Sequence, residues 1–99
     1  MYTDGWFLNG IDMSIDLHRR HQPRMPIYYY LHAYRSPVVS FTEIFGDPSY
    51  DYGVCHADDL LHLFPIMQTP MFHERGPARS DLEMTDVFTG LWTNFATTG

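Results

Sequence analysis

The amino-acid sequence predicts an α/β fold, in which helices cover a buried strand. Two observations carry this prediction. The segment Pro26–Tyr34, which reads PIYYYLHAY, is short, aromatic and almost continuously apolar, as expected for a strand that is buried on both faces. The segments Asp4–Arg20 and Ser80–Thr98 on either side of it repeat apolar residues at the three- and four-residue steps of helices.

The first predicted helix, Asp4–Arg20, can be capped by Thr3 or by Asp4 itself, since both side chains accept hydrogen bonds from backbone N–H groups. Prolines at 23 and 26 then stop the helix, because proline cannot continue the hydrogen-bond pattern. One face of this helix is formed by Phe7, Ile11, Ser14 or Ile15, and His18.

The middle of the chain is expected to be poor in regular structure. Residues Arg35–Gly53 hold two prolines and two glycines, which predicts a loop. Val54–Phe64 is expected to be a loop that passes into a short helix, with Asp58 and Asp59 near its positive N-terminus. Pro65–Arg79, with three prolines and a glycine, is expected to be a surface loop.

The segment Ser80–Thr98 gives the clearest helix signal. Ser80 and Glu83 have the spacing of a capping box, and Gly99 is a natural stop. An apolar stripe suited to ordinary helix packing follows the capping box, and it consists of Met84, Val87, Phe88, Leu91, Trp92 and Phe95.

Composition limits the possible functions. The 99 residues suffice for one small domain, yet 44% are hydrophobic and 16% aromatic, so we expect missing chain or a missing partner to complete the core. A net charge of −6 disfavours nucleic acid as a partner. The sequence has no apolar run long enough to span a membrane and no signal-peptide pattern at its start. No cofactor motif occurs, and His18 and His21 lack further ligands for a metal.

Four segments in order resemble the C-terminal part of the carboxylesterase and cholinesterase family of α/β-hydrolases, with a style closest to insect esterases. They are Tyr2–Phe7 (YTDGWF), Pro26–Leu31 with Tyr34-Arg35, Gly53–Phe64 (GVCHADDLLHLF), and Leu91–Gly99 (LWTNFATTG). The third is the most specific, since the histidine of G-x-x-H-x-x-[DE] is the catalytic base in this family. The resemblance thus implies that His56 is catalytic and that its substrate is a small-molecule carboxylic ester.

The resemblance also implies that residues 1–99 are a C-terminal fragment of an α/β-hydrolase domain. In that fold the catalytic triad runs in the order serine, acid, histidine, so the partners of His56 should lie upstream. The chain has no G-x-S-x-G motif, and no acid precedes the strand at a suitable place. We therefore expect the fragment by itself to be inactive. The localisation of the parent protein is left open, secretion included, because a signal would lie upstream.

Asp59, Asp58 and Cys55 lie near His56 in the sequence, and for each a structural role is weighed against a role in the active site. The resemblance implies that Asp59 supports the hydrogen-bond network of the active site, but it can equally be a carboxylate stabilised by the helix dipole. For Asp58 we expect only the latter role. Cys55 is interpreted as a buried, inert cysteine and not as a nucleophile. His32 is expected to be packed, and His62 and His73 carry no motif.

Three functions compete at this point. The first is a part of an active serine esterase. The second is a non-catalytic relative, since the family includes adhesion proteins that have lost triad residues. The third is a truncated gene product with no function of its own. An intact motif around His56 favours the esterase, because an adhesion protein has no chemical need for the histidine.

Overall fold

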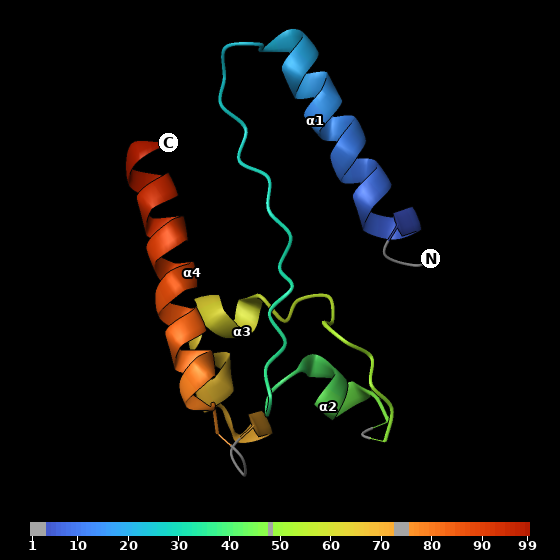
Figure 1. The fold of residues 1–99 in the computed structure, drawn as a ribbon, viewed down its shortest axis with the longest axis vertical. Helices are drawn as coiled ribbons and strands as arrows, with labels where there is room; N and C mark the ends of the chain where they lie inside the picture. Colours follow the sequence, from blue (N-terminus) through green and yellow to red (C-terminus); the bar gives the residue numbers. More distant parts are fainter. Residues whose placement is uncertain (1–3, 48, 73–75) are drawn as a thin grey trace. The chain divides into compact units, whose positions relative to one another are not determined.

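The structure is a computed structural model that describes residues 4–47, 49–72 and 76–99. The chain divides into two compact units, Met1–Tyr30 and Leu31–Gly99 (Figure 1). The first contains α1, and the second contains α2, α3 and α4. Thr3, one of the two expected caps, and His73 lie outside the described residues.

The first unit confirms the predicted N-terminal helix. A π-helical turn, Asp4–Leu8, leads into α1, Asn9–His21. The helix ends where the Gln22 N–H donates to the His18 carbonyl at 2.7 Å, just before Pro23. In the predicted face Ile15 is half-buried while Phe7, Ile11 and His18 are exposed, so this unit builds no core among its described residues.

The predicted strand Pro26–Tyr34 does not form in this structure. The segment has no regular secondary structure, and no strand occurs anywhere in the described part of the chain. Tyr28, Tyr29 and Tyr30 are all more than half exposed instead of buried on both faces. From residue 31 to residue 36 exposed and half-buried side chains alternate, which is the two-residue period of an extended backbone. The backbone is strand-like, but a strand also needs a neighbour to pair with.

The second unit has a small core formed by Val39, Leu61, Met67 and Phe72. Two of these residues come from the segment predicted to be a surface loop, so that prediction is wrong in part. The segment contains two 3-10 turns, Pro65–Gln68 and Pro70–Phe72, each of which begins at a proline. Proline suits the first position of a helical turn because its φ is already fixed near the helical value.

A short helix, α2 (Phe41–Phe45), interrupts the loop predicted between residues 35 and 53. Ser40 caps it, since its Oγ accepts a hydrogen bond from the Thr42 N–H at 3.2 Å. Gly46 ends it, and a Cβ at that position would lie 2.7 Å from the Thr42 carbonyl oxygen and 2.9 Å from the Tyr52 ring. Only glycine fits there without a shift of the neighbouring chain.

The predicted C-terminal helix is confirmed as α4, Arg79–Thr98, but its cap is not the predicted one. Asp81, which is completely buried, accepts the Ala78 N–H at 2.7 Å and the Tyr34 hydroxyl at 2.9 Å. Ser80 lies inside the helix, and Glu83 pairs with Arg79 at 2.9 Å. The observed cap, between Ala78 and Asp81, has the same three-residue spacing as the predicted pair Ser80 and Glu83 but lies two residues earlier.

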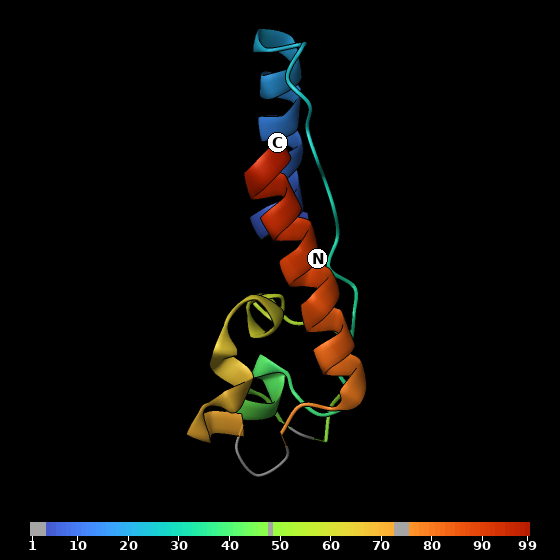
Figure 2. The same cartoon turned by 90° about the vertical axis from the view of Figure 1, so that its left-hand side faces the viewer.

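The first half of α4 is packed against another helix of its unit. The short helix α3, Leu60–Leu63, lies against this half (Figures 1 and 2). Of the predicted apolar stripe Phe88 is buried and Met84 half-buried, whereas the four remaining members are 45–60% exposed: Val87, Leu91, Trp92 and Phe95. Within the described residues no helix has the length and apolar character to cross a membrane.

The exposed stripe predicts that the 99-residue chain self-associates, because apolar surface in water favours contact between copies. Sedimentation velocity should show species larger than the monomer that grow with concentration. The double substitution Val87→Lys with Leu91→Glu should reduce this association. A chain that stays monomeric at all concentrations would contradict the prediction.

Candidate active site

His56 lies at the tip of a tight turn between α2 and α3, within the segment that was predicted to be a loop leading into a short helix. The Asp58 N–H donates to the Cys55 carbonyl at 3.2 Å, which closes a four-residue turn with His56 at its second position. Ala57, at the third position, has φ 74°, as this position does in a type II turn. His56 is exposed, so its imidazole is accessible at the surface of this unit.

Asp58 holds this turn from the inside. It is 7% exposed, and its carboxylate accepts the Cys55 N–H at 2.9 Å. Cys55 and Asp58 therefore bond each other twice, once through each backbone N–H. The same carboxylate accepts the Ser40 hydroxyl at 2.9 Å and the Phe41 N–H at 2.9 Å. The turn is thereby fixed to the start of α2. From the sequence we expected Asp58 only to be stabilised by the dipole of the following helix. Its hydrogen bonds give it the further role of fixing the turn.

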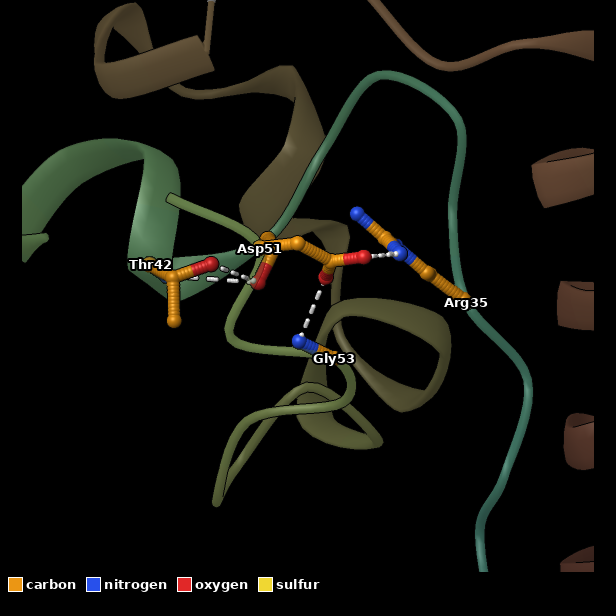
Figure 3. A network of polar contacts seen from close by, with 5 residues as sticks. Arg35, Thr42, Asp51 and Gly53 are labelled. Atoms are coloured by element: carbon orange, nitrogen blue, oxygen red, sulfur yellow. Dashed lines mark hydrogen bonds and ion pairs between the residues drawn. The ribbon is translucent and has the colours of Figure 1, made fainter. Parts of the chain in front are cut away.

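The segment that leads into the turn is held at the surface. Asp51 pairs with Arg35 and accepts the Gly53 N–H at 2.8 Å (Figure 3). The Arg35 guanidinium, with the Gly53 N–H, lowers the pKa of the Asp51 carboxyl. Gly53 has φ 73°, a conformation that glycine adopts without strain. Both charged side chains are more than half exposed, so this pair contributes less to stability than the buried Asp58.

Asp59 and Cys55 are both half-buried at the turn. Asp59 is half-buried at the residue before α3, and its side chain caps no N–H of that helix. Cys55 is a free, half-buried cysteine. Burial, followed by the nearby Asp58 carboxylate, raises the pKa of its thiol, which disfavours the thiolate that a nucleophile needs.

A second histidine, His62, is buried, whereas His56 is exposed. His62, to which the sequence assigned no role, is 2% exposed and packs between His32 (ring centroids 5.6 Å apart) and Tyr34 (5.4 Å). His32 is packed as predicted, with its Nε2 buried and without a hydrogen-bond partner in the described part of the chain. Burial, followed by the charge of His32, lowers the pKa of His62. The sequence motif pointed to His56 alone. It could not reveal the burial of His62, because His62 packs against residues that are distant in the sequence.

Pockets and metal sites add little to this picture. A hollow of about 250 Å³ is lined by residues between 35 and 42 and between 50 and 53, and His56 is not among them. His18 and His21 are exposed on α1. Among the described residues no three His, Cys, Asp or Glu side chains gather as metal ligands would.

Comparisons with known proteins agree with the family resemblance of the sequence. The model of the carboxylesterase family matches residues 1–99. Esterase-5A of Drosophila persimilis is 30% identical over 70 residues, which are 71% of this chain and 13% of that protein. Juvenile hormone esterase of Tribolium castaneum is 30% identical over 103 residues, covering 100% of this chain and 17% of that protein. The chain thus spans at most 17% of the length of these relatives. No solved structure matches it.

The positive φ of Ala57 gives a test of the turn geometry. Ala57→Gly removes the strain of a Cβ in the left-handed region, so the free energy of unfolding should stay unchanged or rise by up to about 1 kcal/mol. Ala57→Val should lower it by about 1–3 kcal/mol. Urea unfolding measures both. Ala33→Gly, in an extended segment, is the control and should only destabilise. An Ala57→Gly variant that loses as much stability as Ala33→Gly would contradict the turn.

The buried His62 predicts a pH-dependent stability. Its pKa is lowered in the folded chain, so the unfolded chain binds a proton first as the pH falls. The free energy of unfolding should therefore decrease below about pH 6.5, the ordinary value for histidine. His32 acts in the same direction as burial, while Asp81 and Asp58 oppose it. Urea unfolding across this range should give a slope that His62→Gln reduces, and an equal slope in both proteins would show that His62 is not its source.

Proposed function

Because the chain belongs to the carboxylesterase family, we propose that it is the C-terminal part of a serine esterase that hydrolyses carboxylic esters, with His56 as the catalytic base. This family has the α/β-hydrolase fold. The observation that carries the proposal is the exposed position of His56 at the tip of a turn that the buried Asp58 anchors. A catalytic base needs both access to substrate and a fixed position.

The proposed chemistry follows from the imidazole. His56 would take the proton of a serine hydroxyl while that oxygen attacks the ester carbonyl, and would then return the proton to the leaving alcohol. The serine, in a G-x-S-x-G motif, and an acid that orients His56 would both come from upstream sequence. Asp59 would support the hydrogen-bond network of this site or only stabilise α3. The fragment alone, without serine and acid, would be inactive.

Two surfaces support the proposal that more chain completes the fold. The extended segment Pro26–Tyr34 has the composition of a central strand, and three of its tyrosines are more than half exposed. The second half of α4 exposes Val87, Leu91, Trp92 and Phe95, which together form an apolar face. In a large hydrolase domain, a neighbouring strand would pair with the extended segment, and other elements would cover the apolar face of α4. The small-molecule ester is the only partner proposed, and neither nucleic acid nor a cofactor is part of the reaction.

The test begins with the reading frame upstream of Met1, which should encode a G-x-S-x-G motif and a later Glu or Asp. In the full-length esterase His56→Gln should lower turnover by about 10⁴- to 10⁶-fold and leave KM nearly unchanged, because glutamine cannot accept the serine proton. Hydrolysis of a small aryl ester measures this effect.

The matched control is His18→Gln, since His18 is an exposed histidine on α1. His62→Gln is unsuitable, because the burial of His62 would mix a loss of stability into the result. If both folded variants kept the same activity, His56 would not be the base and a non-catalytic relative would be the better interpretation. A stop codon directly upstream, with no esterase sequence beyond it, would favour a truncated gene product.

A further inference from the structure

We infer that Asp58 is a positioning residue of the esterase, which acts on the reaction by holding the His56 turn in its catalytic geometry. This inference rests on the proposed function of His56. It concerns the carboxylate two residues after the histidine, whereas the sequence resemblance pointed to Asp59. Asp58 does not touch the reacting atoms, and its effect passes through the backbone of residues 55–58.

The first argument is the set of hydrogen bonds on this one carboxylate. It accepts the Ser40 hydroxyl with both oxygens, at 3.1 and 2.9 Å. It also accepts the Phe41 N–H and the Cys55 N–H, each at 2.9 Å. The residue is 7% exposed, so water can hardly replace these donors. A carboxylate bonded by three groups from two segments has little freedom to move.

The second argument is where these bonds lie relative to His56. Cys55 precedes the histidine and Asp58 follows Ala57, and the two residues bond each other through backbone N–H, backbone carbonyl and carboxylate. His56 and Ala57 are thus the two residues enclosed by a closed hydrogen-bonded loop. Loss of the Asp58 carboxylate removes one of the two bonds that close this loop around the histidine and leaves only the backbone bond from the Asp58 N–H to the Cys55 carbonyl.

The third argument is the conformation of Ala57. Its φ of 74° is the one positive value outside glycine among the described residues, and such a conformation persists only when its surroundings enforce it. Asp58 is the neighbouring residue that supplies the restraint. Without it, Ala57 is expected to relax to negative φ, which would turn the His56 side chain away from its place.

Within the part of the chain that the structure describes, Asp59 has no comparable set of hydrogen bonds. It is half-buried, and its side chain makes no capping bond to α3. The structure therefore gives the two adjacent carboxylates different tasks. Asp58 fixes the backbone of the turn, and any contribution of Asp59 has to come from contacts beyond the segments that Asp58 joins.

The experiment compares two buried carboxylates in the full-length esterase. Asp58→Asn keeps the size of the side chain, but its amide NH₂ faces groups that themselves donate hydrogen bonds. We expect kcat per active site, with active sites counted from the burst of an aryl ester, to fall about 10- to 100-fold, because small displacements of a catalytic base are costly. KM should change little, and the pH dependence of kcat should shift.

The matched control is Asp81→Asn. Asp81 is also buried and accepts one hydroxyl and one backbone N–H, one backbone N–H fewer than Asp58, but it holds α4 and not the turn. This variant should lower the thermal midpoint and leave kcat per active site and its pH dependence unchanged. If Asp58→Asn behaves in the same way, Asp58 is merely structural and the inference is overturned.

A milder variant covers the case in which Asp58→Asn does not fold. Ser40→Ala removes one donor to the Asp58 carboxylate, and it should still lower kcat per active site with an unchanged KM. A folded Ser40→Ala enzyme with the wild-type kcat and pH dependence would overturn the inference. Failure of the proposed function is distinguishable, because the wild-type protein would then be inactive or His56→Gln would remain active.

Discussion

The Asp58 carboxylate is the contact on which the arrangement of the second unit around His56 depends. It joins the start of α2 to the turn before α3, two segments that are otherwise separated by an exposed loop. Removing a buried acceptor leaves its donors without partners, at a cost of about 1–3 kcal/mol for each one. The core of Val39, Leu61, Met67 and Phe72 is too small to absorb several such losses. Stability and the position of His56 are therefore linked through the same side chain.

A second buried carboxylate, that of Asp81, likewise joins two segments at α4. Asp81 accepts the Tyr34 hydroxyl and the Ala78 N–H, so it caps the helix and also holds the extended segment against it. Burial raises the pKa of Tyr34, and the Asp81 carboxylate acts in the same direction, so Tyr34 stays a hydrogen-bond donor. His62 packs beside this contact. Both carboxylates thus connect segments far apart in the sequence, and both combine a hydroxyl donor with a backbone N–H.

The parts of the fold that depend on local sequence were predictable. The pattern of apolar residues predicted α1 and α4, and the motif placed His56 in a loop before a short helix. The strand Pro26–Tyr34 was not predictable in the same way, because pairing requires a neighbouring segment that the described chain does not supply. The burial of His62 involves His32 and Tyr34, which are distant in the sequence, whereas the true cap of α4 is local and was misplaced by two residues. Asp58 and Asp59 look alike in the sequence, and only their hydrogen bonds separate them.

The most direct test of this account is a crystal structure of the full-length protein. It should place Nε2 of His56 within about 2.6–3.2 Å of the Oγ of a serine in a G-x-S-x-G turn. The same structure should keep the Asp58 carboxylate on the Cys55 N–H and the Ser40 hydroxyl. A structure with the His56 imidazole far from any such serine, or with Asp58 turned out to solvent, would contradict the account.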